Sequence, residues 1–214
     1  MRAHIRSVIV GAAAAAVLAA TVSCGDVARQ GRAPVLLVID TIEAASGADP
    51  GTFGGFLLSD VQTLVERTVD GETQMVPTTF NDVGEATLRI VMKDQGTGGS
   101  GTTPSPLNSV TLKQYRITYR RADGRNTEGV DVPFAVSGGV TATIAPNAIV
   151  VVPFEMVRHQ AKEEAPLRAL AASGGRVLIS TIAEITFFGT DLAGNDVQTT
   201  GTLSVSFGDY ADPD

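Results

Sequence analysis

Apolar and polar residues alternate along much of this 214-residue chain with the two-residue period of a β-strand. The alternation is most regular over residues 85–93. One face there carries Ala86, Leu88, Ile90 and Met92, and the other carries Glu85, Thr87, Arg89 and Lys93. Such a pattern predicts a strand in a sheet with one face on the core and the other in water.

The same period predicts further strands, beginning with residues 35–39. Three pairs of strands are expected to form hairpins: residues 61–69 with 72–76, 140–144 with 150–156, and 177–188 with 197–207. Asp70-Gly71 in the first turn is the strongest short hairpin signal, because glycine tolerates positive φ. Pro146-Asn147 and residues 189–196 supply the other turns. We therefore expect a succession of antiparallel strands.

Residues 110–121 form another strand, but its apolar positions change parity near Lys113-Gln114. The apolar side chains fall into two groups: Val110 and Leu112, then Tyr115, Ile117 and Tyr119. A β-bulge inserts one extra residue and brings both groups onto one face. We expect the two tyrosines to pack in the core rather than to present their rings to a sugar or a partner.

One segment has helical character instead. Pro166 suits the first turn of a helix, and Gly174-Gly175 provides a stop. Between them, apolar residues recur at helical spacing: Leu167, Leu170 and Ala171. We expect a short helix that covers one end of the sheets.

Short strands separated by glycine- and proline-containing turns predict an all-β fold over residues 34–208, an antiparallel immunoglobulin-like β-sandwich with one short helix. Residues 95–109, rich in Gly, Ser, Thr and Pro, are interpreted as a long inter-strand loop rather than an interdomain linker. Residues 115–120, followed by Ala122-Asp123-Gly124, resemble the third strand and turn of fibronectin type III and related immunoglobulin-like domains. The resemblance implies a sandwich, and it leaves open one large sandwich or two small ones.

The first 23 residues have the layout of a secretory signal peptide. Arg2 and Arg6 precede an uncharged run over residues 8–22 that ends in small residues. This run of roughly 15 residues is shorter than the ~20 that a membrane-spanning helix needs. Residues 1–23 are therefore expected to be removed on export.

The chain's one cysteine, Cys24, lies where cleavage is expected, and Thr21-Val22-Ser23-Cys24 resembles the lipobox of bacterial lipoproteins. The resemblance implies that Cys24 becomes the first mature residue and carries acyl chains, with residues 24–33 as a polar tether. Each buried methylene contributes about 0.8 kcal/mol, and two chains together hold a protein durably on a membrane. Gly25 stands where some enteric lipoproteins carry an aspartate for inner-membrane retention, which favours the outer membrane.

Loss of the signal peptide reduces the 16 basic residues to 14 against 23 acidic ones, so the net charge moves from −7 to −9. A domain this acidic argues against nucleic acid as a partner and against electrostatic attachment to a membrane surface. The mature 191 residues are long enough to bury a sizeable core. No internal disulfide is possible with one cysteine.

Candidate catalytic residues are few. His159 is the one histidine of the mature chain, and no Gly-x-Ser-x-Gly motif accompanies it. We therefore expect neither a Ser-His-Asp site nor a zinc site. Glu155, Glu184 and Glu163-Glu164 are interpreted as solvated. An enzyme that acts on glycans with two carboxylates is the alternative, because a sequence does not give the distance between carboxylates.

Oxygen-bearing side chains gather in the turn before the last strand. Asp191, Asn195 and Asp196 offer the ligands that Ca²⁺ prefers, but their spacing is not that of the twelve-residue calcium loop. Asp and Asn also favour turns, because their side chains bond to their own backbone. We assign no metal and no cofactor.

The remaining charged segments are interpreted as solvent-facing. A modest basic stripe is a soluble outer face rather than a site for an acidic partner: Lys113, Arg116, Arg120 and Arg121. Residues 209–214 are an acidic, frayed tail. The sequence thus predicts a non-enzymatic, lipid-anchored protein of the cell envelope, with a binding or structural role towards another envelope protein or a glycan.

Overall fold

The computed structural model describes residues 31–94, 104–171 and 173–210. The expected signal peptide, Cys24 and the first part of the tether lie outside the described residues. So do residues 95–103 of the expected loop and residues 211–214 of the tail. All strands expected from the alternation fall inside the described ranges.

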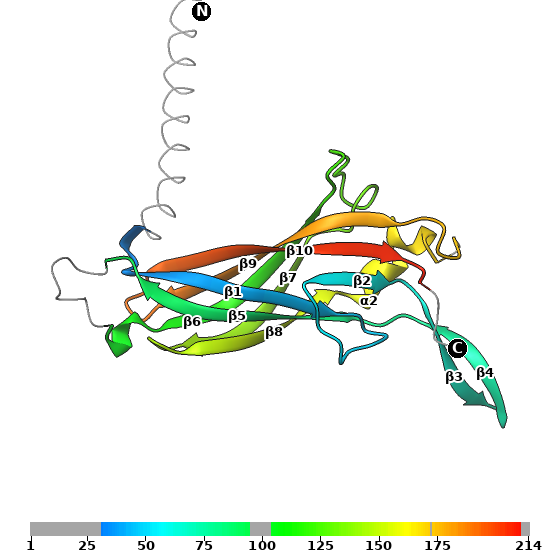
Figure 1. The fold of residues 1–214 in the computed structure, drawn as a ribbon, viewed down its shortest axis with the longest axis horizontal. Helices are drawn as coiled ribbons and strands as arrows, with labels where there is room; N and C mark the ends of the chain where they lie inside the picture. The colour runs from blue at the N-terminus through cyan, green and yellow to red at the C-terminus, as the bar shows by residue number, and fades with distance from the viewer. Residues whose placement is uncertain (1–30, 95–103, 172, 211–214) are drawn as a thin grey trace, which may run out of the picture.

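Two β-sheets face each other and form the body of the molecule (Figure 1). The first sheet has three strands in the order β1 (Val35–Ala45), β5 (Asp82–Met92) and β8 (Ile149–Val157). The second has five, in the order β2 (Phe56–Asp60), β10 (Asp196–Gly208), β9 (Ile179–Asp191), β6 (Val110–Arg120) and β7 (Val136–Ile144). A separate hairpin, β3 (Thr63–Val69) and β4 (Glu72–Thr78), projects from the body. The expected all-β, sandwich-like fold is confirmed.

The core lies between the two sheets and contains the side chains that the alternation assigned to it. Leu88 of β5 is fully buried. The ring of Phe154 lies with its centroid 5.5 Å from that of Tyr115 and 5.5 Å from that of Phe187. Tyr115 and Tyr119 are 4% and 6% exposed, so the expectation that they pack in the core is confirmed.

The β-bulge expected in β6 is also confirmed. The pairings of β6 with β7 and with β9 both shift register between Leu112 and Gln114. Because of the extra residue, Leu112 before the bulge and Tyr115 after it both point into the same core, and both are buried.

The connection between β7 and β8 differs from the expected hairpin. β7 pairs with β6, whereas β8 pairs with β5, so the turn at Asn147 (φ 64°) carries the chain from one sheet to the other. The expected succession of antiparallel strands is interrupted too, because β2 runs parallel to β10. Alternation specifies which face a strand buries, but it does not specify the neighbour with which the strand pairs. Both errors follow from that limit.

The helix expected after Pro166 is wrong in position. An α-helix, α2 (His159–Glu163), precedes the proline, and a single 3-10 turn, η2 (Leu167–Ala169), follows it. Proline disfavours helical backbone at the preceding residue, which separates the two elements. Leu167 is nevertheless fully buried, as the helical spacing indicated. Among the residues described, no helix has the length and apolar character that crossing a membrane requires.

The sandwich has two different ends (Figure 1). At the entry end, where β1 begins, Val35 lies opposite Met92, and the 3-10 turn η1 (Pro106–Asn108) and the β7–β8 and β9–β10 turns lie at this end. At the arm end, Ala45 lies opposite Val83, and the β3–β4 hairpin leaves the body there, near α2. β1, with 11 residues, spans about 36 Å between the two ends at ~3.3 Å per residue.

Candidate functional site

The β3–β4 hairpin, hereafter the arm, is the most exposed regular element of the described chain. Its strands pair from Thr63 opposite Thr78 to Val69 opposite Glu72, as the sequence predicts. Asp70 (φ 54°) and Gly71 (φ 86°) form the turn, which is the conformation that the Asp-Gly signal requires. No arm residue beyond Thr63 is buried.

The arm exposes apolar side chains to solvent. Val69 and Met75 are 42% and 49% exposed. β4 pairs only with β3 among the strands of the described chain, so its other edge faces outwards. A two-stranded ribbon alone is marginally stable in water, and an outward strand edge is a template for another strand. The arm therefore offers both apolar surface and a strand edge to a partner.

A buried ion pair lies where the arm joins the body. Lys162 Nζ, from α2, lies 2.8 Å from Asp82 Oδ1 at the start of β5, and their side chains are 1% and 0% exposed. Lys162 Nζ also donates to the carbonyl oxygen of Asp60, 2.8 Å away, at the end of β2. Asp60 precedes the arm and Asp82 follows it, so one ammonium group joins both chain segments that support the arm.

The Asp82 carboxylate is fully engaged. Ser59 Oγ donates to its Oδ2 over 2.6 Å, and the backbone N–H of Gly47 donates to its Oδ1 over 2.8 Å. Burial raises the pKa of Asp82, while the ammonium of Lys162 and these hydrogen bonds oppose the rise. We call this buried set the arm root: Ser59, Asp60, Thr63, Asp82 and Lys162.

Two further contacts extend the arm root. Thr63 Oγ1 donates to Asp60 Oδ2 over 2.8 Å, and the backbone N–H of Tyr210 donates to Asp60 Oδ1 over 3.2 Å. Asn81 Oδ1 accepts a hydrogen bond from the backbone N–H of His159 over 2.6 Å and lies 2.9 Å from His159 Nδ1. His159 thus starts α2 and contacts the segment between β4 and β5, which is a structural role.

The arm root was not found by sequence reasoning. The sequence pattern singles out neither Lys162 nor Asp82. The two residues are 80 positions apart, so no local period or motif connects them. A lysine among solvated glutamates gives no local sign of burial, and Glu163 and Glu164 beside it are indeed exposed.

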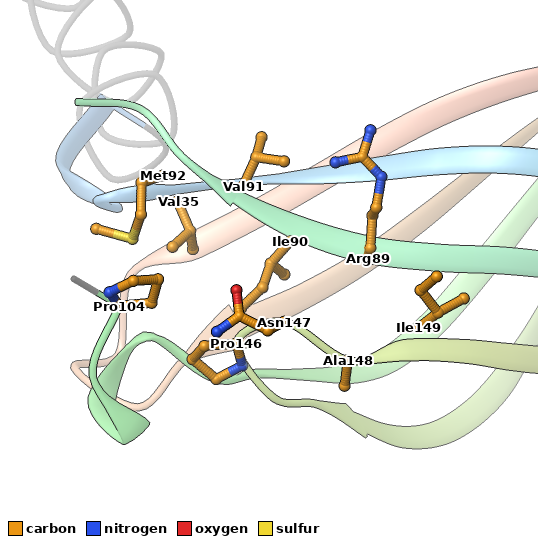
Figure 2. A pocket seen from close by; sticks show the side chains of 10 residues that line it. All are labelled: Val35, Arg89, Ile90, Val91, Met92, Pro104, Pro146, Asn147, Ala148 and Ile149. Carbon is orange, nitrogen blue, oxygen red and sulfur yellow. The ribbon is translucent and has the colours of Figure 1, made fainter. Parts of the chain in front are cut away.

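A cavity of about 470 Å³ lies at the entry end (Figure 2). Its lining is mainly apolar and includes Val35, Ile90, Met92, Pro104 and Ile149. Arg89 is the one charged residue among the ten that line it, and Arg89 Nε is paired with Asp40 Oδ1 at 2.8 Å. The cavity therefore suits an apolar group rather than acid–base chemistry.

The turn between β9 and β10 uses its oxygens internally. Asp191 Oδ1 accepts from the backbone N–H of Asn195 and Asp191 Oδ2 accepts from Asn195 Nδ2, each over 2.8 Å. Within the described ranges, no group of three or more His, Cys, Asp or Glu side chains is placed to hold a metal ion. The geometry is that of a turn stabilised by its own side chains.

The other charged residues considered above lie on the outside. Glu155 pairs with Arg158 at 3.4 Å, and Glu184 pairs with Arg120 at 3.0 Å. Arg121 pairs with Asp123 at 2.7 Å, whereas Lys113 and Arg116 are exposed. Two residues of the basic stripe are thus paired with neighbouring carboxylates and two face solvent, as expected of a solvated face.

Comparison with known proteins adds no family assignment: no protein-family model matches the chain, and no curated protein matches it significantly.

Proposed function

We propose that this chain is a lipid-anchored protein of the bacterial cell envelope, held through Cys24, that acts as a non-catalytic interaction module. The outer membrane is its proposed location. The arm is its proposed contact with another envelope protein, and the exposed arm is the observation that carries the proposal. The signal peptide and the lipobox resemblance support the anchor.

The positions of the two ends of the sandwich support an anchor at one end and a partner contact at the other. The chain enters the sandwich at the entry end, and the arm leaves it at the opposite end (Figure 1). The length of β1, about 36 Å, then separates the anchor from the arm. An anchored sandwich of this shape can hold the arm away from the membrane, towards a partner.

The chemistry of the arm supports strand addition. In that mode a partner strand bonds to the backbone of an exposed edge, while side chains provide specificity. Pro77 lacks a donor, which confines such pairing mainly to the part of β4 before it. Met75, in the middle of that part, is a flexible apolar side chain that adapts to different surfaces. The buried arm root fixes the base of the arm, which lowers the ordering cost of binding.

Photo-crosslinking in intact cells tests the proposal. A photoreactive amino acid replaces Met75 on the arm, and a matched variant carries it at Val130, which is 67% exposed in the β6–β7 loop of the same end. We expect one reproducible envelope protein crosslinked from position 75 and not from position 130. Equal crosslinking from both positions, or none from position 75, would contradict an arm-mediated interaction.

A further inference from the structure

We propose that the entry end of the sandwich lies directly on the lipid bilayer, with apolar side chains from separate segments in the interfacial region. This inference rests on the lipid anchor of the proposed function, and it adds a second contact that the anchor alone does not require. The proposed occupant of this surface is the membrane itself, not a protein.

Exposed apolar side chains are found towards both ends of the sandwich, and three leucines lie at this one. Leu107 in η1 is 68% exposed, Leu192 in the β9–β10 turn is 57% exposed, and Leu36 near the start of β1 is 48% exposed. Val110 pairs with Asp191 and Ile144, which places η1, the β9–β10 turn and the β7–β8 turn at one end. Three segments far apart in the sequence thus present leucines at the end where the chain enters.

The cavity of Figure 2 lies at the same end and enlarges the apolar surface. Met92 and Pro104 line it beside the first residue of β1, Val35. Ile149, on the other side of the cavity, is 67% exposed. A cluster of exposed apolar residues of this kind marks an interaction surface more often than an isolated one does.

The length of the tether identifies the bilayer as the occupant. The first described residue, Gly31, follows Cys24 by seven positions, so even a fully extended tether spans only about 25 Å. That is less than the ~36 Å length of β1, which runs from the entry end to the arm end. The tether therefore holds the entry end continuously near the bilayer, at a high effective concentration, whereas the arm end is under no such restraint.

Charge is compatible with this orientation. Arg32 and Lys113 are exposed near the entry end, and Asp191 there is buried within its turn. Asp94, which follows β5, is an exposed carboxylate at this end, and the arm at the other end carries Asp70 and Glu72. Anionic lipids therefore meet less repulsion at the entry end than the net charge of −9 of the mature chain would imply.

Tryptophan fluorescence tests the contact, because the chain contains no tryptophan and each substitution gives a single reporter. The acylated full chain is prepared as Leu107→Trp, Leu192→Trp and, as the matched control at the opposite end, Met75→Trp. Each is reconstituted into vesicles of phosphatidylethanolamine and phosphatidylglycerol, with and without brominated acyl chains. Side chains at a membrane interface reach ~5–10 Å into the boundary between headgroups and acyl chains. Bromines near the carbonyl end of the acyl chains are within quenching range of that depth.

We expect brominated lipid to quench the Leu107→Trp and Leu192→Trp reporters, with emission shifted to the blue, and to leave Met75→Trp unchanged. Chains that float with the vesicles but show no quenching at the entry end would overturn this inference alone. Equal quenching of Met75→Trp would overturn it as well, since the contact would not be specific to one end. Chains that do not float with vesicles would overturn both the anchor of the proposed function and this inference.

Discussion

Lys162 Nζ lies 2.8 Å from Asp82 Oδ1 in a site where neither side chain is more than 1% exposed. Removing two charges from water is costly, so a buried ion pair gives little net stability relative to apolar residues of similar volume. The pair has a positional role instead, because Lys162 Nζ also donates a hydrogen bond to the carbonyl oxygen of Asp60. The pair therefore fixes the two chain segments from which the arm departs.

Replacing Lys162 by methionine is expected to destabilise the protein strongly. Lys162→Met leaves the Asp82 carboxylate buried without its cation, which costs about 3–5 kcal/mol in comparable sites. Urea unfolding followed by circular dichroism measures the free energy of unfolding. Arg168→Met is the matched control, because Arg168 is an exposed basic residue nearby, and its expected change is within about 0.5 kcal/mol.

The double variant Asp82→Leu with Lys162→Met is expected to lose less stability than the two single variants added together. Removing both charges also removes the cost of the unpaired one. The same unfolding assay applies. Strict additivity of the two single losses would show that the residues do not interact and would contradict the ion pair.

Tyr119→Phe is expected to lower the free energy of unfolding by about 1–3 kcal/mol. The Tyr119 hydroxyl is buried and donates to the carbonyl oxygen of Met156 over 2.6 Å, and burial raises its pKa, so it remains a donor. Tyr115→Phe is the comparison variant, because its part-buried hydroxyl donates to the carbonyl oxygen of Glu155 over 3.3 Å and accepts from the backbone N–H of Glu155 over 3.2 Å, both longer than the bond of Tyr119. A larger loss for Tyr115→Phe than for Tyr119→Phe would contradict this ranking.

Local signals explain which features of the fold were predictable. The inward face of β5 follows from a two-residue period, the bulge at Gln114 from a change of parity, and the arm from Asp70-Gly71. Each of these signals is carried by residues that are close in sequence. The sequence therefore supports a reliable estimate of strand positions and of the core.

Pairings between distant segments were not predictable in the same way. The β7–β8 connection resembled a hairpin, but its strands pair with different sheets, and β2 joins β10 in parallel. Lys162 stands beside the solvated Glu163 and Glu164 in the sequence, yet its position is set by Asp82, 80 residues away. The candidate site was missed because it exists only after the two sheets and α2 meet.

Calcium is expected to leave the thermal unfolding midpoint unchanged. Both oxygens of Asp191 already accept hydrogen bonds from Asn195, so the turn is complete without a cation. Asp191→Ala is expected to cost about 1–3 kcal/mol by removing these acceptors from a buried site. Differential scanning fluorimetry with calcium and with a chelator measures both effects. A rise of the midpoint with calcium that disappears in Asp191→Ala would instead establish a calcium site.

Cys24→Ala is expected to release the protein from membranes or to leave it unprocessed. Acyl chains on Cys24 contribute about 0.8 kcal/mol for each buried methylene, and two chains provide durable attachment. The leucines at the entry end lie in the interface in our proposal and bury far less apolar surface than acyl chains do, so they orient an anchored domain without retaining a free one. Cell fractionation measures attachment, and labelling by a fatty-acid analogue measures modification. A Cys24→Ala chain that stays with membranes through a high-salt wash would contradict the lipid anchor. If that chain lost the label but stayed attached, the sandwich itself would be the part that binds the membrane.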